Sequence, residues 1–468
     1  MKLSRGHTQA FLLESVEGGE RQGRWSFMGA GPREVFRWNR AGDGPLFPKL
    51  AELLGRHREE RRPGLPRMCG GFVGWLSYDI IAEIEPRVRV EGADELGFPD
   101  ALLMDFDTVL AFDHRHHTVR VLAQGRYTEG LDADAVYAAA LARMQRVLET
   151  LAQPLVDERP QAQQAPVELI PRTSREDFMG MVERAQEAVR AGDCQQIVLS
   201  QRFDAELDLP PFELYRALRR VNPSPYLFYF RDGEHALVGS SPETLVRLEG
   251  EEVVLRPIAG TRRRGAGPEE DAALAEELLA DPKENAEHAM LVDLGRNDVG
   301  RVSRIGSVEV TQLRGIERYS HVLHMVSEVR GQIAEGLDAL DVLRATFPAG
   351  TVSGSPKVRA MELIDALEPC RRGPYAGCAG YFDLNGDMEM AITIRTLMQR
   401  GRRVSVQAGA GIVHDSVPAS EYDETVNKAK ALFQAVAQAQ ARSVKTAERV
   451  PTPPQPQPTR ARDEGGGR

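Results

Sequence analysis

The sequence contains little cysteine, and its cysteines show no pattern that suits a metal or redox site. The four, Cys69, Cys194, Cys370 and Cys378, include no Cys-x-x-Cys pair. So few cysteines in 468 residues do not make a disulfide framework, and their spacing does not suit zinc. We expect all four to be reduced residues that pack in the interior.

Long apolar runs and net positive charge are also missing. No stretch approaches the roughly 18 apolar residues that a membrane-spanning helix needs, and the N-terminus contains no apolar signal segment. The net charge of −10 argues against a nucleic-acid-binding surface, and the chain has no Walker A motif for ATP. We therefore expect a cytoplasmic enzyme.

Two segments differ in composition from the rest of the chain. Residues 154–171 are rich in Pro and Gln and have no hydrophobic period, which is typical of a linker. The tail at 442–468 has almost no apolar residues, so it cannot bury enough surface to offset the entropy lost on ordering. We predict an N-terminal part at 1–153, a main domain at 172–441 and a disordered tail.

Helical patterns occur in several places along the main domain. At 175–190, Ser174 is a candidate N-cap with Asp177 three residues on, apolar residues recur every three or four positions, and Gly192 follows as a stop. Further helical patterns cover 269–280, 337–346, 356–367 and 418–440.

Strand patterns cluster instead of alternating one for one with the helices. β-branched and aromatic residues favour strands at 196–203 and 226–230. Later strands flank short polar turns and predict antiparallel hairpins, which pair 244–248 with 253–258 and 391–398 with 404–408. We predict an α+β fold.

Two pairs of glutamates lie at helical spacing. Glu284 and Glu287 form one pair, and Glu421 and Glu424 form the other, with Lys428 one turn beyond Glu424. Residues three or four apart share a helix face, so each pair could enter one cleft or form ion pairs on a solvated surface. Because Mg²⁺ uses one or two protein carboxylates and keeps several waters, one glutamate from each pair would suffice. The spacing alone leaves both interpretations open.

Three polar residues stand out next to strand patterns. Arg395 and His324 each lie inside one, where a polar side chain is costly unless it has a structural partner or a function. Glu243 comes directly after a strand and Pro242, which also suits an ordinary turn carboxylate.

Residues 404–413 predict a strand that runs into a Gly-x-Gly turn at Gly409 and Gly411. Such a turn lets backbone amides approach an anion closely. His414 stands where a dinucleotide fingerprint has its third glycine, so a nicotinamide site has little support.

Four longer motifs resemble the chorismate-utilising enzymes, and most of all their anthranilate synthase component I branch. They are Pro-Ile-Ala-Gly-Thr-Arg at 257–262, Glu-His-Ala-Met-Leu-Val-Asp-Leu-Gly-Arg-Asn-Asp at 287–298, Phe-Pro-Ala-Gly-Thr-Val-Ser-Gly-Ser-Pro-Lys-Val-Arg-Ala-Met-Glu at 347–362, and Gln-Ala-Gly-Ala-Gly-Ile-Val at 407–413. The similarity runs from about Phe11 to Phe433. It implies antiparallel sheets packed as a sandwich with helices outside, a regulatory part at 1–153 and a chorismate-binding catalytic domain at 172–441.

The resemblance also implies a reaction and a metal site. The branch converts chorismate and ammonia to anthranilate and pyruvate in tryptophan biosynthesis. Glu287 and Glu424 fall at the positions of the Mg²⁺ ligands. Glu284 and Glu421 are their neighbours, in contact with metal-bound water or substrate.

Other site residues carry over from the resemblance in the same way. Tyr375 and Arg395 match the residues that hold the enolpyruvyl carboxylate, while Gly260, Gly409 and Gly411 supply backbone amides near the ring carboxylate. Lys428, Thr351 and Thr261 line the same site. Glu243 matches the general acid that protonates the departing ring hydroxyl, and His324 matches the histidine needed for pyruvate elimination.

Two positions discriminate among the relatives that the family contains. Isochorismate and salicylate synthases place a lysine base where Gln196 stands, and an amide cannot take a proton from water. Aminodeoxychorismate synthase component I, the alternative assignment, typically has a nucleophilic lysine where Ala259 stands. Both residues therefore favour anthranilate synthesis.

The resemblance finally implies a regulator and a partner. Glu14 and Ser15, together with Pro225 and Tyr226, look like the two segments that form the tryptophan feedback pocket. No cysteine lies in the Gly-x-Cys-x-Gly elbow of a glutamine amidotransferase, so we expect a separate amidotransferase subunit to deliver ammonia.

Overall fold

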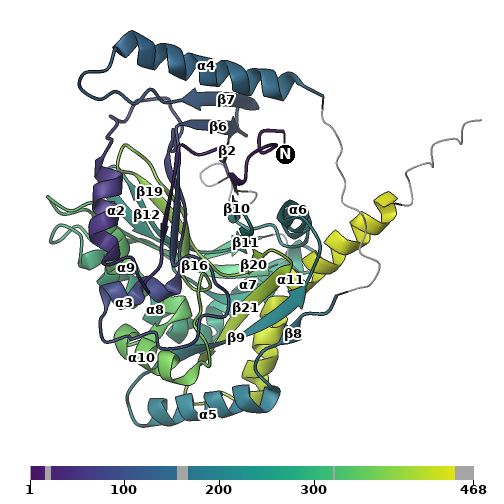
Figure 1. The fold of residues 1–468 in the computed structure, drawn as a ribbon. Coiled ribbons are helices and arrows are strands. Elements are labelled where there is room, and N and C mark those ends of the chain that lie inside the picture. Colours follow the sequence, from purple (N-terminus) through teal and green to yellow (C-terminus); the bar gives the residue numbers. More distant parts are fainter. Residues whose placement is uncertain (1, 16–22, 155–166, 320–321, 448–468) are drawn as a thin grey trace, which may run out of the picture.

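Two antiparallel β-sheets pack face to face, and most helices lie on the outside (Figure 1). The computed structural model describes residues 2–15, 23–154, 167–319 and 322–447, with the backbone alone from 442 to 447. Within these residues the sheets contain eleven and ten strands. The predicted α+β class and the sandwich that the resemblance implied are confirmed.

The first sheet combines strands from the N-terminal part of the chain with strands from the main domain. Its strands, in spatial order, are β17 (Gly354–Ser355), β9 (Gln196–Glu206), β21 (Arg403–Ile412), β20 (Thr396–Arg400), β11 (His235–Ser241), β10 (Tyr226–Asp232), β1 (Gln9–Glu14), β2 (Trp25–Ala30), β6 (Thr108–Asp113) and β7 (Thr118–Ala123), and β8 (Ile170–Pro171) pairs with β9. Strands from the N-terminal part therefore continue a sheet that the main domain begins.

The second sheet also combines strands from the N-terminal part with strands from the main domain. Its order is β14 (Ile258–Arg263), β16 (Val322–Gln332), β13 (Glu252–Leu255), β12 (Thr244–Glu249), β19 (Met388–Ile392), β18 (Cys378–Phe382), β4 (Gly71–Leu76), β5 (Ala101–Phe106) and β3 (Glu34–Trp38), and β15 (Glu309–Arg318) pairs with β16.

The helices of the described residues cover both faces of the sandwich (Figure 1). They are α2 (Leu46–Gly55), α3 (Ile81–Ile84), α4 (Ala133–Ala152), α5 (Arg175–Arg190), α6 (Pro211–Val221), α7 (Pro268–Ala280), α8 (Pro282–Gly300), α9 (Ala339–Thr346), α10 (Lys357–Leu367) and α11 (Pro418–Ala447), with short 3₁₀ turns η1 (Tyr78–Ile80) and η2 (Gly350–Val352). None of these helices is long and apolar enough to cross a membrane.

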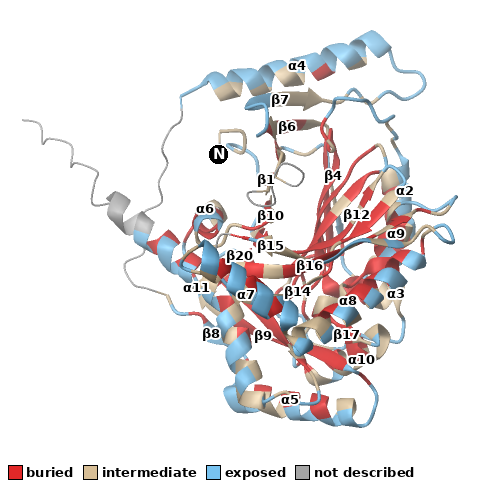
Figure 2. Cartoon of the chain, turned by 180° about the vertical axis from the view of Figure 1, so that it is seen from behind, coloured by how far each residue is buried: buried red, intermediate tan, exposed pale blue. Residues whose placement is uncertain are grey.

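Alternating side chains of β10 show how the layers hold together. Phe228 and Phe230 point into the core between the two sheets, while Leu227 and Tyr229 pack against α6 and α11. Successive side chains of a strand point to opposite faces, so a strand that is apolar at every position serves two cores. The strands at the centre of the sandwich are accordingly buried along most of their length (Figure 2).

Most of the predicted elements are present. The side chain of Ser174 caps α5 by accepting a hydrogen bond from Asp177 N, as its sequence indicates. The helices predicted at 269–280, 337–346 and 356–367 correspond to α7, α9 and α10. α11 starts as expected but continues beyond residue 440 to Ala447. All four cysteines are free, and three of them are buried.

The two predicted hairpins need correction. Ile258 does not end β13 but begins β14, which pairs with β16. The strand predicted at 391–398 is two strands in different sheets, because the chain leaves β19 and crosses to β20 with Arg395 at a left-handed φ of 50°. The hairpin partner of β21 is therefore β20 alone.

Parts of two predicted segments lie outside the described residues. These are 155–166 of the linker and 448–468 of the tail. The described end of the linker, at Ile170–Pro171, pairs with β9 as the short strand β8.

Candidate active site

The residues predicted to form the site come from both sheets and from two helices. β9 carries Gln196, β21 carries Gly409 and Gly411, β14 carries Gly260 and Thr261, β16 carries His324, and α8 and α11 carry the two glutamate pairs. Short contacts connect these elements, as described below.

One lysine, Lys428, acts on a glutamate of α8 and on a glutamate of α11. Burial raises the pKa of Glu287, the Glu284 carboxylate adds to the shift, and the Gln196 amide and Lys428 oppose it. Burial also raises the pKa of Glu421, with Glu424 adding to it and Lys428 again opposing it. One ammonium group that acts on both carboxylates indicates that the two helices direct their glutamates toward a common space.

Lys428 connects α11 to β21. Its Nζ is 2.7 Å from Glu424 Oε1 and donates to the carbonyl oxygen of Gly409 at 3.0 Å. A cation is thus already held between a carboxylate and a backbone oxygen, which are hard donors of the kind that Mg²⁺ prefers.

A metal at this position would use few protein ligands. Among the described residues, no group of three or more His, Cys, Asp or Glu side chains is arranged to hold a metal ion. A site built from Glu287 and Glu424 needs only two carboxylates, since Mg²⁺ retains water and takes substrate oxygens. The residues present therefore fit a Mg²⁺ ion that is completed by its substrate.

The two glycines of β21 do not form the predicted turn. Both lie within the strand, which pairs with β9 as far as Ile412. A Cβ at Gly409 would lie 2.8 Å from Tyr375 Oη and from Leu199 O, and one at Gly411 would lie 2.3 Å from Gln196 Nε2. The glycines are needed because side chains approach the strand closely.

Gly260 has a different reason to be glycine. Its φ is 70°, in the left-handed region that disfavours a Cβ. A Cβ there would also lie 3.1 Å from Glu284 Oε2, so this backbone passes directly beside the Glu284 carboxylate of α8.

The tautomer of His324 follows from its hydrogen-bond partners. Its Nδ1 is 3.1 Å from Gly260 O and 3.1 Å from Thr261 Oγ1. A carbonyl oxygen only accepts, so Nδ1 carries the hydrogen that it donates, and Nε2 keeps a lone pair. Burial lowers the pKa of His324, and the neutral ring is therefore a base.

Glu243 is a buried acid at the junction of β11 and β12. Burial raises its pKa to about 8, although the Thr351 hydroxyl and the Ile258 amide partly oppose this. The carboxyl is therefore largely protonated near neutral pH and can act as a proton donor.

Arg395 lies at the crossing between the sheets, and Tyr375 is near enough to influence its charge. Burial lowers the pKa of the Arg395 guanidinium, and Tyr375 is the group that opposes this shift. Among the described residues, no carboxylate forms an ion pair with Arg395. A desolvated arginine without a protein anion is suited to bind an anionic ligand.

Comparisons with known proteins identify the family of this chain. The model of a family described as chorismate binding enzyme matches residues 8–434. The chain belongs to this family. Anthranilate synthase component 1 of Pseudomonas putida is 47% identical, with 93% of this chain and 92% of the relative covered. The same component of Thermus thermophilus is 45% identical over 94% of this chain and 95% of the relative.

Solved structures of the family share the fold. Anthranilate synthase component I from Streptococcus pneumoniae TIGR4 superposes with a TM-score of 0.79 at 38% identity, covering 89% of this chain and 95% of that one. The menaquinone-specific isochorismate synthase from Escherichia coli reaches a TM-score of 0.71 at 21% identity, with 93% and 90% covered, and shows the fold alone. The resemblance to anthranilate synthase component I is confirmed.

The structure of this chorismate-binding enzyme also brings the four predicted tryptophan-contacting residues together. Glu14, Ser15, Pro225 and Tyr226 line one cavity, where β1 and β10 of the first sheet face β18 and β19 of the second. Tyr215 Oη donates to Glu14, and Arg219 Nε donates to Glu14 Oε2 at 2.9 Å. The cavity combines an apolar floor with a held carboxylate.

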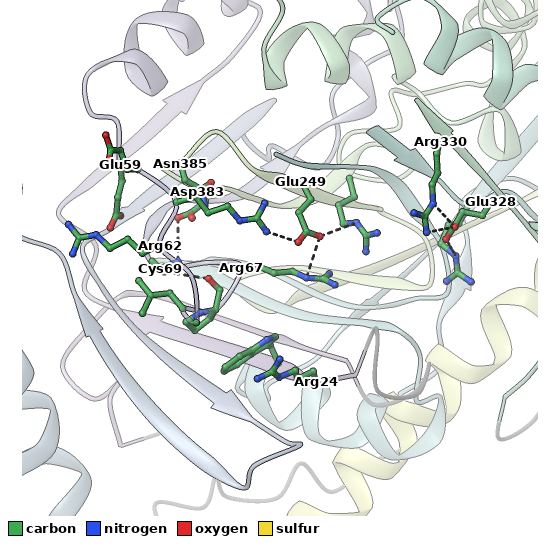
Figure 3. A pocket seen from close by; sticks show the side chains of 18 of the residues that line it. Arg24, Glu59, Arg62, Arg67, Cys69, Glu249, Glu328, Arg330, Asp383 and Asn385 are labelled. Carbon is green, nitrogen blue, oxygen red and sulfur yellow. Dashed lines mark hydrogen bonds and ion pairs between the residues drawn. The ribbon is translucent and has the colours of Figure 1, made fainter. Parts of the chain in front are cut away.

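A larger cavity of about 590 Å³ has none of the predicted catalytic residues in its lining (Figure 3). Arginines and carboxylates alternate along its wall and pair with one another, for example Arg61 with Glu249 at 2.6 Å and Arg330 with Glu328 at 2.7 Å. Arg67 lines both this cavity and the one that contains Tyr226. The positive and negative charges that line the 590 Å³ cavity largely compensate each other, so this cavity is not suited to bind a single anion.

One neighbour of the site was not predicted. Arg262 donates from Nη1 to Glu284 Oε1 at 3.1 Å and from Nη2 to Asp281 Oδ2 at 2.8 Å. It follows Thr261 directly, but neither charge nor spacing in the sequence indicates that its partners lie on α8. Only the fold shows that this arginine orients one of the glutamates.

Proposed function

We propose that this chain is component I of an anthranilate synthase, which converts chorismate and ammonia to anthranilate and pyruvate. The observation that carries the proposal is Gln196, which lies against Gly411 and acts on Glu287, where the water-adding relatives have a lysine base. An amide cannot activate water, so ammonia is the nucleophile that the site favours. The names of the relatives described above support the same choice.

Substrate binding follows from the charges of the site. Chorismate is a dianion, and four glutamates nearby would repel it. Arg395 offers an unneutralised cation for the enolpyruvyl carboxylate, and Tyr375 lies beside it. Backbone amides near Gly260, Gly409 and Gly411 and the Lys428 ammonium serve the ring carboxylate. When bound at Glu287 and Glu424, Mg²⁺ supplies a Lewis acid for that carboxylate and offsets the glutamate charge.

Two residues divide the proton transfers. The protonated Glu243 donates to the ring hydroxyl as it leaves, while ammonia adds to the ring. The neutral His324, with Nε2 free to accept, removes a proton in the second step, in which pyruvate leaves and the ring becomes aromatic. The Thr261 hydroxyl orients His324, and Thr351 lines the same cavity as Glu243.

Three further features belong to the proposal. A separate glutamine amidotransferase delivers ammonia, tryptophan binds the cavity of Glu14, Ser15, Pro225 and Tyr226 as a feedback inhibitor, and the enzyme works in the cytoplasm. The alternative activity, aminodeoxychorismate synthesis, is disfavoured because Ala259 lacks a nucleophile at the position where that branch has lysine.

The test is product analysis with purified protein. Chorismate, a high concentration of ammonium and Mg²⁺ should yield anthranilate, identified by its fluorescence and by chromatography. Isochorismate or aminodeoxychorismate as the main product would overturn the assignment. Glutamine should replace ammonium only after an amidotransferase subunit is added, and activity of this chain alone with glutamine would contradict the two-subunit proposal.

A further inference from the structure

A buried ion pair contacts β9, one of the strands of the candidate active site. The side chains of Arg372 and Glu368 are 2% and 4% exposed. Arg372 donates from Nε to Glu368 Oε2 at 2.9 Å and from Nη2 to Glu368 Oε1 at 2.6 Å. Two parallel hydrogen bonds fix the plane of the guanidinium group relative to the carboxylate.

Both residues of the pair also form hydrogen bonds with strand β9. Arg372 Nη2 donates to Val198 O at 2.7 Å, and Glu368 Oε1 accepts from Ser200 N and Ser200 Oγ, both at 2.8 Å. Val198 and Ser200 are the register partners of Gly411 and Gly409 in β21. The ion pair therefore fixes β9 directly opposite the two glycines that face the substrate in the proposed function.

Two other parts of the site touch the same guanidinium. Arg372 Nη1 donates to Val352 O at 2.7 Å, one residue after Thr351. Its Cζ lies 5.7 Å from the centre of the Tyr375 ring and 4.7 Å from that of Tyr78. Arg372 is thus connected to the strand, to the Thr351 turn and to the tyrosine that lines the site.

We propose that Arg372 and Glu368 are positioning residues that set the spacing between Tyr375, Thr351 and the β9–β21 strand pair, and thereby the affinity for the substrate's carboxylates. This inference rests on the proposed function, because it takes chorismate as the substrate. Stability alone does not account for such a pair, since an apolar pair of similar volume often stabilises a core as well or better. Only the planar five-donor fork of arginine reaches Glu368 and both carbonyl oxygens at once.

The central experiment uses Arg372→Lys. Lysine keeps a cation next to Glu368 but cannot span the carbonyl oxygens of Val198 and Val352. The KM for chorismate should rise about tenfold or more, with a smaller change in kcat, because the substrate contacts are misplaced while the reacting groups remain. An unchanged KM would overturn the proposal.

A charge-free double variant separates positioning from stability. Arg372→Met alone leaves Glu368 buried without its partner and should lower the melting temperature. Adding Glu368→Leu should recover part of the lost melting temperature, because no charge is then left buried without a partner, but should leave the KM high. If the KM recovers together with the melting temperature, the pair is merely structural and the proposal fails.

The adjacent arginine provides a matched control. Arg371 is also ion-paired and mostly buried. Its partners, however, are Asp79 and Asp100 of the N-terminal part of the chain. Arg371→Lys should leave the KM for chorismate unchanged. If the wild-type enzyme makes no anthranilate, the proposed function fails, and calorimetric titration of the same variants with chorismate and Mg²⁺ still tests whether Arg372 controls binding.

Discussion

Glu243 combines a catalytic assignment with a measurable pH dependence. Burial raises its pKa to about 8, and the protonated form is the one that can donate. The kcat/KM for chorismate should therefore fall as the pH rises through about 8. Glu243→Gln should lower amination by about 10²-fold or more at every pH, because its amide cannot donate an acidic proton. A variant that keeps most of the activity would remove Glu243 from the mechanism.

The same carboxyl should make the folded protein less stable as the pH rises from about 4.5 to about 8. Above its unfolded pKa of 4.5 and below about 8, the folded protein holds a proton that the unfolded chain releases. The free energy of unfolding therefore decreases as the pH rises through this window. Glu243→Gln should raise it by about 4 kcal/mol near pH 8 and by less than about 1 kcal/mol near pH 5. Chemical denaturation at the two pH values measures the difference.

His324 should affect only the second half of the reaction. His324→Met removes the ring nitrogen that accepts a proton but leaves Glu243 and the metal-binding glutamates in place. Chorismate should still be consumed, and 2-amino-2-deoxyisochorismate should accumulate. Its detection by chromatography checks the prediction, and loss of all chorismate turnover would contradict the separation of the two steps.

At the scale of the elements, α8 and α11 each contribute one metal ligand in the proposed site. Glu287→Gln or Glu424→Gln should weaken Mg²⁺ binding and abolish both steps, because little then remains to hold the ion. Calorimetric titration with Mg²⁺ in the presence of chorismate measures the loss directly. Glu276→Gln, on the exposed face of α7, is the control and should bind Mg²⁺ normally. Equal affinities in all variants would place the metal elsewhere.

The close approach of Gln196 to Gly411 of β21 can be tested by adding a Cβ. In Gly411→Ala, the new Cβ would lie 2.3 Å from Gln196 Nε2, so Gln196 must move. Chorismate turnover should drop by about tenfold or more, since small displacements of site residues are costly. Gly180→Ala is a matched control because no atom lies within 4 Å of its new Cβ on α5. It should keep full activity and raise the free energy of unfolding by up to about 1 kcal/mol.

Local signals in the sequence were sufficient for some elements but not for others. The helix α5 could be predicted because its cap, its apolar period and its stop all lie within a few residues of one another. The crossing at Arg395 could not, because residues 391–398 are apolar on both sides of it and nothing local marks a change of sheet. Gly409 and Gly411 were recognised as site residues, but their straight backbone depends on β9, which is about 200 positions away in the chain.

Candidate site residues could be named from the sequence, but the contacts that support them could not. Glu284, Glu287, Glu421 and Glu424 were identified from spacing and resemblance, and the structure directs them toward one space. Arg372 and Glu368 look like ordinary surface charges in the sequence. Their role depends on Val198, Ser200 and Val352, which reach them only through the tertiary fold.

At the scale of the whole molecule, the proposed tryptophan cavity and the proposed active site lie at different places in one sandwich. Allostery requires tryptophan to bind the less active state more tightly than the active one. Ser15→Leu should fill the cavity and raise the tryptophan concentration needed for half-inhibition about tenfold or more, with nearly normal activity when tryptophan is absent. If the wild-type enzyme does not bind tryptophan by calorimetry, the feedback proposal fails while the catalytic one stands.

The position of β1 between β2 and β10 has a consequence for biosynthesis. β10 begins at Tyr226, 212 residues after β1 ends at Glu14, so the ribosome must make that length before β1 can pair on both sides. At roughly 5–20 residues per second this takes roughly ten to forty seconds. During that interval the apolar strand Gln9–Glu14 has one open edge, which is a target for aggregation. The nascent chain should therefore depend on chaperones until the second half of the sheet emerges.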